Sequence, residues 1–142
     1  VVAKMQKFID ELFYPSAHSN WDDALFREHL LRYMTKESVI LDIGAGAGIV
    51  EQMNFRGQVA KVIGVDLDPR VVENRFLDDG FVSDAASLPF PDDSFDVVFA
   101  DNVMEHIDHP TEMLQEIWRV LRPGGYFLFK TPNRNHYMPL MP

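Results

Sequence analysis

The hydrophobic pattern of the chain changes near residue 36. Before this point apolar residues recur at helical spacing, and residues 5–14 predict a helix that Pro15 ends. A second helix is predicted to begin near Ser19 or Asn20, whose side chains can cap free backbone N–H groups. The first quarter of the chain is therefore expected to be helical.

After residue 36 short apolar runs alternate with longer amphipathic stretches. The runs predict five strands, at residues 39–43, 62–65, 81–83, 95–100 and 126–129. The stretches between them predict helices at residues 48–55, 70–77 and 111–121. This alternation is typical of an α/β fold, in which a doubly wound parallel sheet carries helices on both faces.

The composition narrows the class of protein. The 142 residues, 46% hydrophobic and 25% charged, suit one globular domain. The chain has no cysteine, which excludes disulfides, thiolate metal sites and a cysteine nucleophile. No apolar run approaches the roughly 20 residues that span a bilayer, and the N-terminal pattern is unlike a signal peptide. We therefore expect a cytoplasmic protein without a membrane partner.

The formal net charge is −9, and the acidic residues are concentrated in one part of the chain. Residues 66–116 hold 14 acidic side chains and only Arg70 and Arg75 as basic ones. Such a segment repels a phosphate backbone and attracts a small cationic ligand, so nucleic acid is not an expected partner. An acidic surface that serves only solubility is the alternative.

A run of alternating glycines follows the first predicted strand, which ends in Asp42-Ile43 before Gly44-Ala45-Gly46-Ala47-Gly48. Glycine permits a sharp turn and lets a ligand approach the backbone, so the loop is typical of nucleotide binding. The third glycine of the dinucleotide fingerprint would fall at position 49, where the chain has Ile49. A tight turn without any ligand is the alternative.

Two further acidic residues end predicted strands. Asp66 stands 18 residues after Gly48, close to the spacing at which a carboxylate binds ribose hydroxyls. Asp84 ends the third strand, where its carboxylate and the next backbone N–H can recognise the edge of adenine. The alternatives are local: Asp66 or Asp68 could cap the next helix, and Asp84 could be a turn residue.

Four segments in order resemble class I S-adenosylmethionine-dependent methyltransferases of the small-molecule type found in ubiquinone and menaquinone biosynthesis. They are VILDIGAGAG, VIGVDLDP, SDAASLPFPDDSFDVVFADNVMEHI and WRVLRPGGYFLF, within residues 39–132. The resemblance implies a Rossmann-like doubly wound sheet, and relative to that family we expect this chain to be truncated after the fifth strand. It divides one domain into an N-terminal helical lid or cap (1–36), a cofactor-binding core (37–132) and a tail (133–142).

The resemblance also implies which residues bind the cofactor, S-adenosyl-L-methionine. These are Asp42, Gly44, Ala45, Gly46, Gly48, Asp66, Leu67, Asp84, Ala85, Ala100 and Asp101. In this family the glycine loop holds the methionine part, and Asp42 orders the loop or reaches the amino group through water. Asp66 binds ribose and Leu67 packs on adenine. Ala100 and Asp101 approach the amino group and the sulfonium.

The implied activity is methyl transfer to a small-molecule acceptor by in-line displacement, for which positioning supplies most of the rate. Glu105 and His106 are the candidate catalytic bases, with His106 preferred; a histidine that only packs or faces solvent is the alternative. No metal is expected, because the stretch Thr131-Pro132-Asn133 offers one oxygen ligand where a magnesium site of this family needs carboxylates.

Two other functions stay open. An NAD-dependent oxidoreductase would explain the glycines, although the loop spacing fits less well and no Tyr-x-x-x-Lys motif is present. The other is a noncatalytic module, which would retain the fold and bind the cofactor or serve as a scaffold without catalysing a reaction. An unpaired fifth strand would also expose backbone groups to another chain, so a homo-oligomer through that edge is a further expectation.

Overall fold

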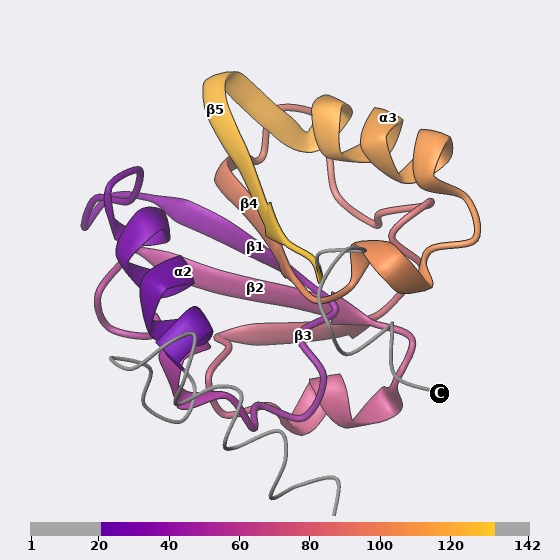
Figure 1. Ribbon diagram of the computed structural model, residues 1–142. Coiled ribbons are helices and arrows are strands. Elements are labelled where there is room, and N and C mark those ends of the chain that lie inside the picture. Colours follow the sequence, from indigo (N-terminus) through magenta and orange to yellow (C-terminus); the bar gives the residue numbers. More distant parts are fainter. Residues whose placement is uncertain (1–20, 133–142) are drawn as a thin grey trace, which may run out of the picture.

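The computed structural model describes residues 21–132, which form one five-stranded sheet in the order β3-β2-β1-β4-β5 (Figure 1). Its strands are β1 (Val39–Ile43), β2 (Lys61–Asp66), β3 (Asp79–Val82), β4 (Phe95–Asp101) and β5 (Leu121–Lys130). All neighbouring strands are parallel. The predicted doubly wound sheet is confirmed, and the strand order reverses at β1.

Within residues 21–132, one helix covers each face of the sheet (Figure 1). On one face α2 (Trp21–Leu31) buries Phe26 and Leu30 against side chains of β1 and β4. On the other face α3 (Pro110–Val120) buries Met113 and Ile117. Because both faces of β1 and β4 are covered, most residues of these strands are apolar.

Two predicted helices are wrong. Residues 48–55 contain only the 3-10 turn η1 (Glu51–Met53), and residues 70–77 only η2 (Pro69–Glu73). Gly48 has a φ of +71°, and the residues that end η1 and η2, Asn54 and Asn74, are extended. Hydrogen bonding by asparagine side chains in a turn competes with helix formation, which explains why the chain leaves the helical path there.

The boundary between the last helix and the last strand also differs from the prediction. The helix α3 ends at Val120, and Leu121 is already extended with φ −73° and ψ 134°. The strand β5 therefore starts before the Arg-Pro-Gly-Gly turn, and its pairing with β4 shifts in register between Phe95 and Val97. A β-bulge of this kind absorbs the extra residues of the turn.

Some predictions fall on residues that are not described. The helix at 5–14, most of the lid at 1–36 and the tail at 133–142 lie outside the described residues 21–132. Within that range no helix has the length and apolar character to cross a membrane.

Candidate functional site

The glycine loop leaves the carboxyl end of β1 in left-handed backbone conformations. Gly44, Gly46 and Gly48 have φ values of +75°, +52° and +71°, which side chains rarely tolerate. The Gly44 N–H donates to the carbonyl of Val65 at the end of β2, with an N···O distance of 2.8 Å. The path of the loop by itself therefore favours glycine at these positions.

Asp66 fastens the loop to the end of β2. Its Oδ2 accepts a hydrogen bond from the Gly46 N–H at 2.8 Å, and its Oδ1 accepts one from the Asp68 N–H at 2.8 Å. Capping of η2 falls to Asp68, whose carboxylate accepts from the Arg70 backbone N–H at 2.9 Å. Hydrogen bonds from Arg70 lower the pKa of Asp68 to about 2. Asp66 thus faces the loop and does not cap the next segment.

Asn74 is a loop-holding residue that the sequence pattern did not reveal. Its side chain is 6% exposed, and its Nδ2 donates to the carbonyls of Ala45 at 2.9 Å and Gly46 at 3.2 Å. Its Oδ1 accepts from the Phe76 N–H at 2.9 Å. A Cβ on Gly48 would come within 2.2 Å of that Oδ1. The loop and Asn74 are separated by 28 or more residues, so no local signal connects them.

Replacing Asn74 with alanine is expected to cost about 1–3 kcal/mol of unfolding free energy, because buried hydrogen bonds on the loop are lost. The cavity beside the loop then loses its fixed wall, so ligand affinity falls as well. Denaturant unfolding measures the first effect and calorimetry the second. Asn54→Ala, in the nearby turn after η1, is the matched control, and equal losses in both variants would contradict a special role for Asn74.

A cavity of about 210 Å³ lies beside the loop, at the point where the strand order reverses. Open α/β sheets bind ligands at this point. Six of the residues predicted to bind the cofactor line it: Asp42, Gly44, Ala45, Gly46, Gly48 and Asp101. The other lining residues are Ala47, Ile49, Val50, Met53, Asn74 and Phe76.

The surroundings raise the pKa values of two carboxyl groups in this cavity. Burial raises the pKa of Asp42 well above its ordinary value, and the negative charges of Asp101 and Asp66 raise it further. Burial also raises the pKa of Asp101, although Lys130 opposes that effect. A cationic group in the cavity would relieve this electrostatic cost, since opposite charge favours the ionised form.

Asp42→Asn is expected to raise the melting temperature at about pH 7.5 by several degrees. A raised folded-state pKa means that the Asp42 carboxyl favours folding most at low pH and loses that contribution as pH rises above its unfolded value. The advantage of the asparagine variant should therefore shrink toward about pH 5. Thermal melts at the two pH values measure the difference in melting temperature between variant and wild type. Asp79→Asn, at an exposed position, is the control. A difference that does not depend on pH would contradict the burial argument.

The remaining predicted cofactor residues lie along the same edge of the sheet but do not line the cavity. Leu67 is 70% exposed after β2. Asp84 is exposed after β3, and its Oδ1 accepts from the Ala86 N–H at 2.8 Å, as a turn aspartate does. The side chains of Ala85 and Ala100 are buried in the core beside α3, so only their backbone groups are available to a ligand.

The two candidate bases lie in the 3-10 turn η3 (Met104–His106), after β4. Both side chains are exposed. Glu105 accepts a hydrogen bond from the Thr131 hydroxyl at 3.0 Å, which joins this turn to the end of β5. Neither residue lines the cavity beside the glycine loop.

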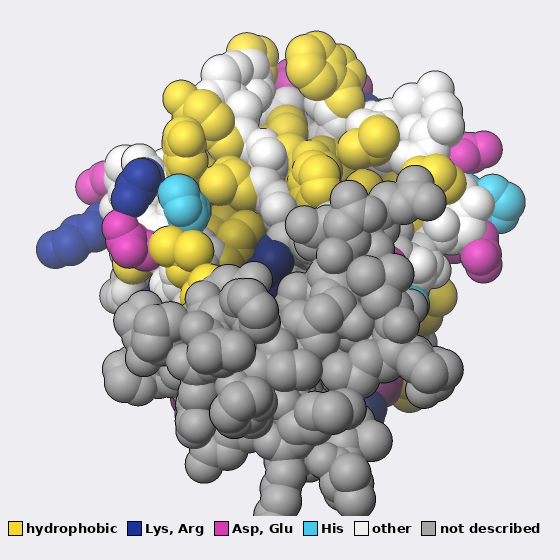
Figure 2. All heavy atoms as spheres, viewed as in Figure 1, with side chains coloured by type: hydrophobic (Ala, Val, Ile, Leu, Met, Phe, Trp, Pro, Cys, Tyr) yellow, Lys and Arg dark blue, Asp and Glu magenta, His cyan; other side chains and the backbone are white. Residues whose placement is uncertain are grey.

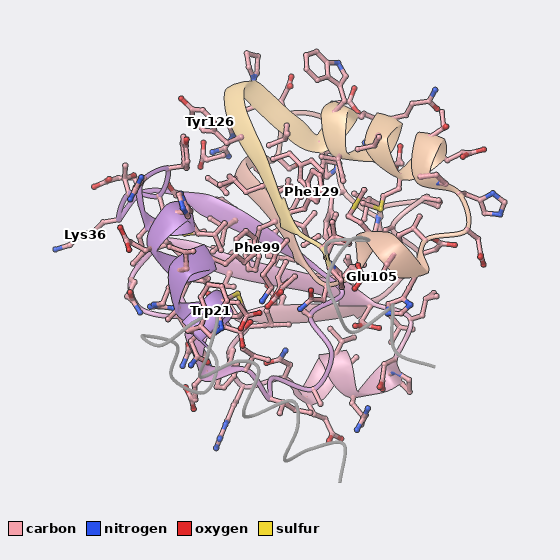
Figure 3. The ribbon with its side chains drawn as sticks, viewed as in Figure 1. Trp21, Lys36, Phe99, Glu105, Tyr126 and Phe129 are labelled. Carbon is pink, nitrogen blue, oxygen red and sulfur yellow. The ribbon has the colours of Figure 1, made fainter. Side chains whose placement is uncertain are left out.

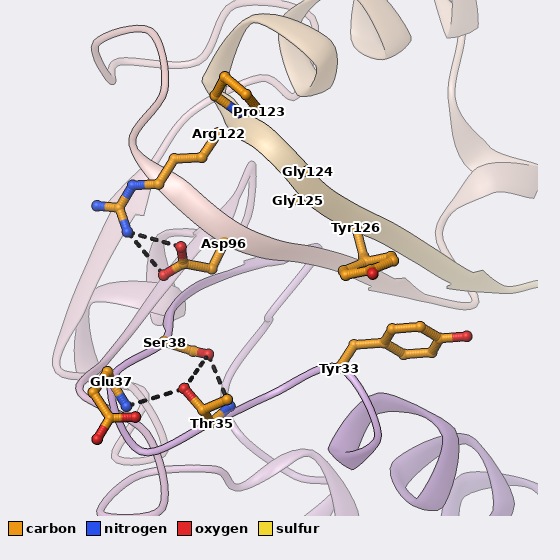
Figure 4. A pocket seen from close by; sticks show the side chains of 10 residues that line it. All are labelled: Tyr33, Thr35, Glu37, Ser38, Asp96, Arg122, Pro123, Gly124, Gly125 and Tyr126. Carbon is orange, nitrogen blue, oxygen red and sulfur yellow. Dashed lines mark hydrogen bonds and ion pairs between the residues drawn. The ribbon is translucent and has the colours of Figure 1, made fainter.

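A larger hollow, of about 430 Å³, lies at the opposite edge of the sheet (Figure 4). Arg122 pairs there with both oxygens of Asp96, at 2.9 and 2.8 Å, and Asp96 also accepts from the Val39 N–H at 2.8 Å. The rings of Tyr33 and Tyr126 lie 4.5 Å apart. These contacts join the start of β5 to the chain entering β1, so their role is structural.

Comparison with known proteins identifies the family. Residues 41–129 match the model of the methyltransferase domain family. A probable S-adenosylmethionine-dependent methyltransferase of Mycolicibacterium smegmatis is 38% identical over 104 residues, covering 70% of this chain and 40% of that protein. A ubiquinone biosynthesis O-methyltransferase of Pseudomonas putida is 33% identical over 107 residues, covering 68% and 45%.

A solved structure supports the same assignment. The crystal structure of the YcgJ protein from Bacillus subtilis superposes with a TM-score of 0.64 and 31% sequence identity, over 73% of this chain and 49% of that one. This chain thus spans less than half the length of these relatives. The predicted resemblance and the Rossmann-like fold class are confirmed. The chain belongs to the class I S-adenosylmethionine-dependent methyltransferases.

Proposed function

We propose that this domain binds S-adenosyl-L-methionine at the carboxyl edge of the sheet and that the protein transfers its methyl group to a small-molecule acceptor by in-line displacement. The observation that carries the proposal is the cavity beside the glycine loop, whose wall combines loop backbone with Asp42 and Asp101. A cavity lined by carboxyl groups suits a ligand with a cationic amino-acid part. When bound, this cofactor supplies a methyl group activated by a positively charged sulfur.

The residues present fit such a ligand. The loop backbone and the acidic residues Asp42 and Asp101 would hold the methionine part. Asp66 already orients the loop and has further acceptor capacity for ribose hydroxyls, because each carboxylate oxygen can accept more than one hydrogen bond. Leu67 and the backbone around Asp84 and Ala85 would contact adenine. The cavity of about 210 Å³ is small for the whole ligand, so the adenosine part would extend along the open edge.

Titration calorimetry with S-adenosylhomocysteine and with NAD tests this proposal. We expect binding of the first and none of the second. Preference for NAD would favour the oxidoreductase, and absence of binding by the folded chain would reject the proposal. Binding without turnover on small hydroxyl and amine acceptors would favour the noncatalytic module.

His106→Ala is expected to leave S-adenosylhomocysteine affinity within about twofold of the wild type, because the side chain is exposed on η3 and does not line the cavity. As the proposed base, His106 would affect only turnover; Glu105→Gln tests the second candidate in the same way. Calorimetry and a methylation assay separate the two effects. A tenfold loss of affinity would make His106 a cofactor ligand and overturn its assignment.

The proposal has two further parts. The methyl acceptor is a small molecule, and the chain forms a homo-oligomer through β5. Support for the acceptor class comes from the name of the ubiquinone biosynthesis relative. Support for the oligomer comes from β5, which lies at the edge of the sheet formed by residues 21–132; its Tyr126 and Phe129 are about half exposed, on a face where apolar side chains gather (Figure 2). Light scattering of the purified chain measures its oligomeric state. The cytoplasmic location and the absence of nucleic acid stay predictions.

A further inference from the structure

Lys130 joins three elements that are distant in the sequence. From the last position of β5 its Nζ lies 3.0 Å from Asp22 Oδ2 and in direct contact with Asp23 Oδ1, both in the first turn of α2. The same Nζ lies 2.9 Å from Oδ1 of Asp101, at the end of β4. The Lys130 side chain is 16% exposed, and those of Asp23 and Asp101 are each 13% exposed. An ammonium so sheltered from solvent is not an ordinary surface charge.

The backbone around this cluster is fixed as well. The Asn102 N–H donates to the carbonyl of Lys130 at 2.8 Å, and Asn102 has a φ of +54°, so the chain turns sharply directly after Asp101. The Lys130 Nζ also lies 6.0 Å from the centre of the Phe26 ring on α2. Asp101 is the member of this cluster that lines the cavity beside the glycine loop. The cluster therefore connects α2 to the proposed cofactor site through one carboxylate.

We propose that Lys130 is a positioning residue of the cofactor site: its ammonium holds the Asp101 carboxylate ionised and in place for the amino group of the ligand, and it ties the first turn of α2 to that carboxylate. This inference rests on the proposed cofactor and adds to it a residue that does not itself line the cavity.

Charge balance gives the physical reason. Lys130 faces Asp22 and Asp23 on α2 and Asp101 on β4, while Asp42 on β1 lies close enough to Asp101 for their charges to interact. Without the ammonium, the sheltered carboxylates of Asp23 and Asp101 and the half-exposed carboxylate of Asp22 would lie close together with no counter-charge, and like charges disfavour ionisation. Asp101 would then take up a proton or turn away. With the ammonium present the cluster keeps an excess of negative charge, so it still attracts a cationic ligand.

A pair of ligands separates this role from a purely structural one. S-adenosylhomocysteine carries the amino-acid group, whereas 5′-methylthioadenosine lacks it and contacts only the adenosine part of the site. In Lys130→Met we expect S-adenosylhomocysteine affinity to fall about tenfold and methylthioadenosine affinity to stay within about twofold. Lys130→Arg keeps the positive charge, so its affinity for S-adenosylhomocysteine should be close to that of the wild type.

Lys61→Met is the matched control, since it removes the same charge from an exposed ion pair with Asp79 at the far edge of the sheet. If Lys130→Met does not fold, Lys130→Gln keeps hydrogen-bond donors and carries the same comparison. Equal weakening of both ligands, or no weakening of either, would overturn the inference while leaving the proposed cofactor in place. A wild-type chain that binds neither ligand would reject the proposed function and this inference with it.

Discussion

Replacing Asp66 with alanine is expected to weaken S-adenosylhomocysteine binding by about 10- to 150-fold, since hydrogen bonds to a charged group contribute about 1.5–3 kcal/mol and tenfold in affinity is about 1.4 kcal/mol. Two effects combine. The proposed bonds to the ribose are lost, and the Gly46 N–H loses the acceptor that fixes the glycine loop. Titration calorimetry on variants of confirmed fold measures the change.

Asp79→Ala provides the control for Asp66. It removes the same charge from β3, where Asp79 forms a half-exposed ion pair with Lys61 at 2.7 Å. Its affinity is expected to stay within about twofold of the wild type, because such surface pairs contribute little. An unchanged affinity in Asp66→Ala would show that the ribose is bound by another residue.

Phe99→Ala is expected to lower the free energy of unfolding by about 3–5 kcal/mol, the range for removing a buried phenylalanine from a core. The Phe99 side chain is 0% exposed on β4, and its ring meets that of Phe55 edge to face, with centroids 5.6 Å apart at 73°. It also packs in the same apolar cluster as Phe26 and Leu30 of α2, so the cavity left by the substitution would lie between the sheet and the helix (Figure 3). Guanidinium unfolding followed by two probes gives the free energy and tests for two-state behaviour.

Phe129→Ala is the control for Phe99. Phe129 lies on the neighbouring strand β5 and is 50% exposed, so the same truncation removes far less contact area (Figure 3). We expect a loss of about 1 kcal/mol or less. Equal losses of unfolding free energy in the two variants would contradict the burial of Phe99 in a core between α2 and β4.

Much of the candidate site could be predicted because its residues lie at the carboxyl ends of strands or in the loop directly after one. Asp42, the glycines and Asp101 stand at the carboxyl ends of β1 and β4, and parallel pairing of these strands places them around one cavity. Asp66 is the last residue of β2 and contacts the loop. The roles of these residues toward a cofactor, like those of Glu105 and His106, stay predictions.

The contacts that hold the site together depend on the tertiary structure. Asn74 bonds to loop carbonyls 28 and 29 residues away, and Lys130 meets Asp22 and Asp23 across 108 and 107 residues. Hydrophobic periodicity reports only which face of a local element is buried, so it carries no information about such partners.

By itself the sequence determined the parallel sheet, the order of its elements and the glycine loop. The predicted bounds of β1, residues 39–43, agree with the structure. A short, mostly apolar run between Ser38 and Gly44 is typical of a strand that is buried on both faces. Only the tertiary structure decided that the segments after the glycine loop and after β2 are short 3-10 turns and that β5 begins at Leu121. In the two 3-10 segments the backbone angles follow from asparagine side-chain hydrogen bonds, and in β5 they follow from strand register across the sheet; these contacts outweigh helical preference.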